Sequence, residues 1–179
     1  MEKIFFILGE LSDDDIDWML QKGERQEIPP NTVLIEEGKP VDSIYLILDG
    51  TLSVSIAPLE GKQIAIISSG EMVGEMSFID YRPPSATVKT IEKSLVLSIP
   101  RQELAKTLHI DTGFASRFYR ALAILLSTRL RGTISQLGYG QNPSQDGDIQ
   151  MDQLNPNILD NIAIARNRFD WILRRLRDA

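Results

Sequence analysis

The chain has 179 residues and a formal net charge of −6, and 42% of its residues are hydrophobic. This length and balance fit one globular domain with appendages, and the acidity excludes attraction to nucleic acid or an anionic membrane through the overall field. With no cysteine in the sequence, disulfides, thiolate nucleophiles and zinc–sulfur sites are excluded. No apolar stretch approaches the roughly 18 residues of a membrane span. We therefore expect a cytoplasmic protein.

The first predicted element is a helix that begins after Ser12. A serine followed by three aspartates is typical of a helix N-terminus, because the hydroxyl caps a free N–H and the carboxylates face the positive end of the helix dipole. Gly23 is expected to end this helix.

Short apolar or alternating runs follow between residues 25 and 100, separated by Gly- and Pro-containing turns. This spacing predicts an antiparallel sandwich or barrel. The Asp49-Gly50 pair between two apolar runs is the strongest signal for a two-residue hairpin. The expected strands are 32–35, 43–48, 52–56, 63–67, 86–90 and 95–99.

After Pro100 the pattern becomes helical. A short helix is predicted over 101–108 and a long one over 112–137, where apolar residues recur every four positions. A helix with this much apolar surface needs two partners, and we expect them to be the β domain and a second copy of the chain. The recurring residues are Phe114, Phe118, Leu122, Leu126, Leu130 and Ile134.

The C-terminal part divides into a polar linker and a final helix. We assign residues 1–137 to a β domain with its flanking helices, 138–155 to the linker and 156–179 to a C-terminal helix. The apolar residues of this helix form a heptad-like seam, which predicts packing on another helix. Together with the long helix, this seam predicts a homodimer. The seam comprises Ile158, Ile162, Ala165, Phe169, Ile172 and Leu176.

The segment from Gly74 to Val88, GEMSFIDYRPPSATV, resembles the phosphate-binding cassette of cyclic-nucleotide-binding domains. This family includes the catabolite activator proteins and the regulatory subunits of cyclic-AMP-dependent kinase. The runs 35–38 and 44–50 resemble its second to fourth strands, and the resemblance covers about residues 8 to 135. It implies an α+β fold, an antiparallel β-roll of jelly-roll type with an N-terminal helix and a long C-terminal helix.

The resemblance also implies a binding site for cyclic AMP or cyclic GMP, with no metal and no further cofactor. In the family, the residue at Glu75 accepts a hydrogen bond from the ribose hydroxyl, and the residue at Ser85 contacts the phosphate or the base. A glycine at 74 allows close approach of backbone to ligand. The expected ligand-binding residues are Gly74, Glu75, Met76, Ser77, Arg82, Ser85, Ala86 and Thr87.

One position departs from the family's pattern. Pro84 stands where the family has an arginine that pairs with the cyclic phosphate, and proline offers neither charge nor N–H. Leaving a buried anion without its counter-charge costs roughly 3–5 kcal/mol. Arg82 lies two positions earlier and could reach the same point through a reshaped loop.

Several residues have two interpretations. Glu75 binds ribose or caps the short helix that begins beside it. Arg82 pairs with a phosphate or with a surface carboxylate such as Asp80. Ser85 contacts a ligand, or it is simply a small residue where strand and loop are crowded. Ser127 and Thr128 on the long helix contact a base or are solvated.

Two further features are expected to be structural. His109 fits the C-terminal turn of its helix, where its ring suits the dipole. The arginines of the last helix, diluted by aspartates, favour a solvated face of a packing helix over contact with nucleic acid or membrane. They are Arg166, Arg168, Arg174, Arg175 and Arg177.

Two functions follow from these observations. The first is a regulatory module that binds a cyclic nucleotide and signals through its C-terminal helices to the second subunit or to an unknown protein partner. The second is a degenerate domain of the same fold that binds no nucleotide and serves as a dimeric interaction scaffold. A transcription factor would need a helix-turn-helix, and a metalloenzyme on a β-roll would need several histidines. We therefore expect neither DNA binding nor an enzyme.

Overall fold

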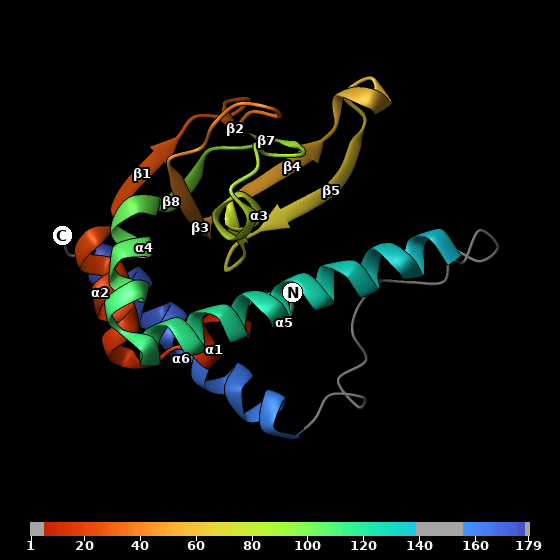
Figure 1. Cartoon of the computed structure of the whole chain (residues 1–179). Helices are drawn as coiled ribbons and strands as arrows, with labels where there is room; N and C mark the ends of the chain where they lie inside the picture. The colour runs from red at the N-terminus through yellow and green to blue at the C-terminus, as the bar shows by residue number, and fades with distance from the viewer. Residues whose placement is uncertain (1–5, 139–155, 178–179) are drawn as a thin grey trace.

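Two four-stranded antiparallel sheets, flanked by helices, form the centre of the fold (Figure 1). The computed structural model describes residues 6–138 and 156–177. The strand orders are β1-β8-β3-β6 and β2-β7-β4-β5, which confirms the predicted α+β β-roll. The strands are β1 Glu24–Ile28, β2 Val33–Ile35, β3 Ser43–Asp49, β4 Thr51–Ser55, β5 Gln63–Ser68, β6 Met72–Val73, β7 Thr87–Thr90 and β8 Ser94–Pro100.

The core between the sheets is made by alternate residues of the strands, because successive side chains of a strand point to opposite faces. Aliphatic side chains from both sheets meet there. Strand β8 lies centrally, between β1 and β3. The buried residues of this core are Ile35, Val41, Ile47, Leu52, Ile67, Val73, Val88 and Val96.

The Asp49-Gly50 pair is not a hairpin, so that prediction is wrong. Strand β3 pairs with β6 and β8, whereas β4 pairs with β5 and β7, so the chain crosses from one sheet to the other at Gly50. Gly50 has φ +106°, and a Cβ there would overlap Ser94. A glycine that would favour a tight hairpin turn therefore equally allows the chain to turn a corner from one sheet to the other.

Helices gather at one end of the roll: α1 Phe6–Glu10, α2 Asp13–Lys22, α4 Arg101–Ile110 and α6 Pro156–Arg177 (Figure 1). Helix α5, Thr112–Gly138, begins at the same end and runs along the roll below α3 (Figure 1). Helix α2 begins as predicted. The Ser12 hydroxyl accepts from the Asp15 backbone N–H at 3.2 Å, and the Asp15 carboxylate accepts from the Ser12 N–H at 2.8 Å. This reciprocal pair is a capping box.

Helix α5 has two apolar faces. Residues four apart on a helix are rotated by about 40° from one another, so the predicted stripe turns around the helix along its length. Phe114, Phe118 and Leu122 are buried against the domain, whereas Leu130 and Ile134 are 61% and 58% exposed. The second face is therefore exposed within the chain, and the predicted second copy that would cover it stays a prediction.

Helix α6 packs on α1 of its own chain. Its seam is buried there through Ile162, Ala165, Phe169 and Ile172, with Leu176 partly buried. The seam was also expected to contribute to a homodimer, and this part stays a prediction; within the chain, α1 covers these residues. Most of the predicted linker, residues 139–155, and the side chain of Ile158 lie outside the described residues.

Among the helices in residues 6–138 and 156–177, none combines the length and hydropathy that crossing a bilayer requires.

Candidate functional site around helix α3

Helix α3, Glu75–Asp80, lies where the sequence placed the cassette helix, directly after β6. Gly74 precedes it as the N-cap residue with φ +89°. A Cβ at this position would lie 3.0 Å from the Ser43 carbonyl oxygen. Both the positive φ and the close approach to β3 favour glycine here.

The Glu75 carboxylate is buried, with 4% of its side chain exposed, and is paired with Arg129 of α5. The Arg129 Nη1 donates to Glu75 Oε1 at 2.6 Å. This short, charge-assisted hydrogen bond joins the cassette helix to the long helix. Neither of the two interpretations of Glu75 included this partner.

Arg129 makes further contacts on the same side. Its Nη2 donates to the Met72 carbonyl oxygen at 2.7 Å and lies 3.8 Å from Glu71 Oε1. The other oxygen of Glu71 accepts from the Ser68 N–H at 2.8 Å. The guanidinium therefore bridges α5 to β6 and to the cassette helix, while its Nε is buried without a hydrogen-bond partner.

The Arg82 side chain is 83% exposed, and its Nε lies 3.9 Å from the Asp80 carboxylate. The Arg82 backbone N–H also donates to Asp80, at 3.0 Å. The structure thus has the surface pairing that was one of the two interpretations of Arg82. In this arrangement the guanidinium does not take the place of the family's buried arginine.

The loop after α3 is tied to the turn that follows β2. The Pro84 carbonyl oxygen accepts from the Gly38 N–H at 2.8 Å, and the Thr87 hydroxyl accepts from the Glu37 N–H at 3.1 Å. The Glu37 carboxylate in turn accepts from the Ala57 N–H at 2.7 Å. Thr87, a predicted ligand residue, thus already has a partner within the fold.

The remaining predicted residues differ in exposure. Met76 is 53% exposed and Ser77 is buried, while Ser85 is exposed and Ala86 half-buried. On α5, Ser127 is exposed and Thr128 half-buried. A charged residue of α5 that reaches the cassette is instead Arg129, the next in sequence.

An aromatic contact forms a second link between the cassette and α5. The rings of Phe78 and Phe118 meet edge to face with centroids 5.9 Å apart, and Phe118 meets Phe114 in the same way at 6.0 Å. Such pairs stabilise by about 0.5–1.5 kcal/mol beyond their burial. The cassette helix is therefore packed directly against α5.

Residues 25–111 match the family described as the cyclic nucleotide-binding domain. These residues form a domain of that family. A solved cyclic nucleotide-binding domain from Methylobacillus flagellatus is similar over 81% of this chain and 86% of its own, with 24% identity and a TM-score of 0.69. The regulatory subunit of a cAMP-independent protein kinase A from Trypanosoma brucei is similar over 76% of this chain and 44% of its own, with 20% identity and a TM-score of 0.54. Both likenesses show the shared fold.

A curated relative is an uncharacterized NTE family protein of Mycobacterium bovis, 30% identical over 120 residues. The match covers 67% of this chain and 20% of that protein. The chain thus spans about one fifth of the length of this relative.

Proposed function

We propose that the chain is a dimeric regulatory domain of the cyclic-nucleotide-binding fold that works without a cyclic nucleotide. The observation that carries this proposal is the pair between Glu75 and Arg129. It engages, from within the chain, one oxygen of the carboxylate to which the family's ribose hydroxyl binds. The neutral hydroxyl of a nucleotide would have to share this carboxylate with a stronger, charge-assisted donor that already lies at 2.6 Å.

The phosphate end of the cassette supports the same proposal. Pro84 has no charge to offer, and Arg82 is exposed beside Asp80. A cyclic phosphate would therefore be desolvated without a counter-charge, at a cost of roughly 3–5 kcal/mol. At about 1.4 kcal/mol per tenfold, a micromolar affinity becomes millimolar or weaker. A cAMP-independent regulatory subunit with this fold among the similar structures is consistent with such use.

The exposed face of α5 supports the dimer. Tyr119, Ala123, Leu126, Leu130 and Ile134 follow one another at steps of three and four residues, all exposed except the half-buried Leu126. This spacing is that of a helix seam which pairs with a second helix. Because the identical seam exists on every copy, a two-fold pair of α5 helices covers both at once.

Nucleotide binding is tested by isothermal titration of the full chain with cyclic AMP and with cyclic GMP. We expect no micromolar binding by the wild-type chain and a gain of affinity in Pro84→Arg. Arg82→Ala serves as the matched control, since it removes an exposed arginine of the same loop and should change nothing. Micromolar binding by the wild-type chain that Arg82→Ala abolishes would show that Arg82 acts as the phosphate partner and would overturn the proposal.

Dimerisation is tested by light scattering over a range of micromolar concentrations. We expect a dimer for the wild-type chain and a monomer for Leu130→Asp. The substitution would bury two like-charged carboxylates, one from each copy, in the apolar interface between the α5 helices. Ile110→Asp is the control, since Ile110 is 82% exposed on α4, away from the seam. A monomeric wild-type chain would contradict the proposed dimer.

A further inference from the structure

Helix α6 packs mainly on the five-residue helix α1, and its Arg168 and Arg175 reach Asp13 and Asp17 of α2. Figure 1 shows α6 beside these two helices, at the end of the molecule where the chain also enters α5. One buried apolar cluster includes Ile162, Ala165, Phe169 and Ile172 of α6 together with the fully buried Ile7 and Leu8 of α1. Interactions that fix the position of α1 therefore also stabilise the packing of α6 on it.

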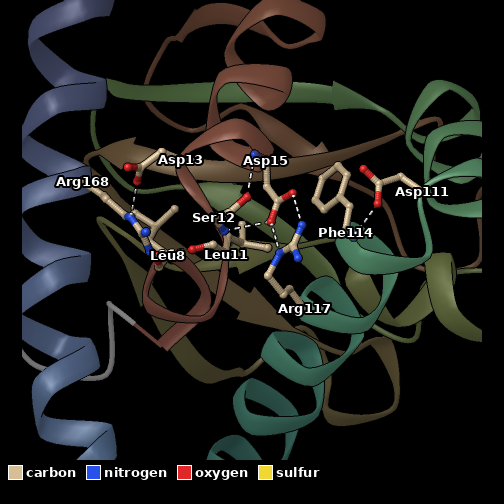
Figure 2. Close-up of polar contacts among 9 residues, drawn as sticks. All are labelled: Leu8, Leu11, Ser12, Asp13, Asp15, Asp111, Phe114, Arg117 and Arg168. Atoms are coloured by element: carbon tan, nitrogen blue, oxygen red, sulfur yellow. Dashed lines mark hydrogen bonds and ion pairs between the residues drawn. The ribbon is translucent and has the colours of Figure 1, made fainter.

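Arg168 is the principal polar anchor of α6 (Figure 2). Its Nη1 donates to the carbonyl oxygens of Leu8 at 2.8 Å and Leu11 at 2.5 Å, and its Nε donates to Asp13 at 2.9 Å. The last carbonyls of a helix have no partner within it, and a cation there also faces the negative end of the dipole. Arg168 thus caps α1 and touches the first turn of α2.

Helix α5 holds the same two segments from the other side. Arg117 donates to both oxygens of Asp15, at 2.6 and 2.8 Å, as Figure 2 shows. Arg120 donates to one oxygen of Glu10 at 2.7 Å, and Asn161 of α6 donates to the other at 3.1 Å. Glu10, at the end of α1, is therefore bound by α5 and α6 together.

A helix as short as α1 is not stable by itself, because isolated helices need roughly 12–15 residues to be even marginal. Its helical state therefore depends on the contacts that α5 and α6 make with it. If either neighbour leaves, the other loses part of its binding surface. Two partners that each stabilise one marginal element bind it cooperatively, and the coupling is reciprocal.

We propose that α1 and the first turn of α2 form a cooperative joint that makes the seating of α6 conditional on the position of α5. Helix α6 then stays packed on α1 while Arg117 and Arg120 of α5 bind Asp15 and Glu10. When α5 moves and these bonds break, α6 is released from α1. This inference does not depend on whether the cassette binds a nucleotide. It concerns only how a movement of α5 reaches the C-terminal helix.

The test is amide hydrogen exchange of the full chain, followed separately in α6, in α1–α2 and in β8. In Arg117→Gln, we expect exchange within residues 161–176 to rise about fivefold or more, although the bonds of Arg117 go to α2. Ile35→Val is the control, since it weakens the separate core between the sheets. Unchanged protection of α6 in Arg117→Gln, or a rise no larger than in Ile35→Val, would overturn the proposal.

A second variant tests the joint from the other side. In Gly9→Ala, the new Cβ would lie 2.7 Å from the Asn161 carbonyl oxygen, so α6 must shift. Gly132→Ala is the matched control, because it is the same change in a helix with no atom within 4 Å. We expect faster exchange in α6 and also in residues 112–125 of α5 for Gly9→Ala alone. Faster exchange confined to α6 would show that the coupling is absent.

Discussion

Arg129 Nη1 lies 2.6 Å from Glu75 Oε1, although the two residues are 54 positions apart. The pair joins the helix that opens the cassette to the longest helix of the molecule. Under the proposed function, this carboxylate, which in the family lies at the ribose site, acts as a structural anion. The energetic weight of the pair can be measured.

Arg129→Met should destabilise the domain by about 1.5–3 kcal/mol, because it leaves the buried Glu75 carboxylate without its charged donor. Urea unfolding gives the free-energy change. Combined with Glu75→Gln in a double-mutant cycle, it should show a coupling energy of about 0.5–3 kcal/mol. Arg131→Met, at an exposed position of the same helix, should remain within about 0.5 kcal/mol of wild type. A zero coupling energy would mean that the pair carries no stability.

Stability should fall in acid through Asp15. Burial raises the pKa of this carboxyl, but hydrogen bonds from Arg117 and Ser12 and the charge of Arg117 outweigh it, so the pKa lies below its usual 3.8. A group whose pKa is lower when folded stabilises above its unfolded pKa and loses this contribution as pH falls through the folded value. Asp15→Asn should therefore flatten the fall in unfolding free energy below about pH 4.

The control for this titration is Asp14→Asn, which removes the same charge from an exposed position in the same turn. Its unfolding free energy should keep the acid dependence of the wild-type chain. Equal slopes for Asp15→Asn and wild type would assign the acid sensitivity to other carboxyls.

Gly50→Ala should destabilise the domain more than Gly61→Ala. Both glycines have positive φ, +106° and +74°, but a Cβ at Gly61 meets open space whereas one at Gly50 overlaps Ser94. The left-handed backbone alone costs about 1–2 kcal/mol, and forcing an atom into a packed site adds about 1–3 kcal/mol. Thermal and urea unfolding of the two variants would compare them directly, and equal losses would mean that the corner relaxes.

Ser12→Ala should cost about 0.5–2 kcal/mol, since it removes the hydroxyl that caps α2. Ser127→Ala, on the exposed side of α5, is the control and should be neutral. Circular dichroism during urea unfolding would measure both. A neutral Ser12→Ala would indicate that the Asp15 carboxylate alone holds this helix end.

The sequence allowed the prediction of those elements whose pattern is local. The cap at Ser12, the six strands, the cassette helix after Gly74 and the α6 seam each depend on neighbouring residues. Strand β1, Glu24–Ile28, was missed because its charged side chains give no apolar alternation. Helix α1 was missed because five residues carry no helical period.

The site was harder to predict than the fold. The short helix of the cassette lies after Gly74 as predicted, but the partner of Glu75 lies on another element, and nothing in the spacing of Arg129 distinguishes it from other helix arginines. The corner at Gly50 was misread for a related reason: a two-residue turn looks the same whether the next strand pairs with the last or joins the other sheet. Both the partner of Glu75 and the corner at Gly50 depend on pairing between distant parts of the chain, which the local sequence pattern does not reveal.

The central place of β8 has a consequence for the order in which the domain forms. Strands β1 and β3 both pair with β8, and β2 pairs with β7, so neither sheet can close until residues 87–100 have been made. On the ribosome, β1 and β2 must therefore wait unpaired for partners far along the chain, and β3 can pair only with β6 before β8 is made. Such non-local pairing folds slowly and leaves strand edges exposed in the meantime.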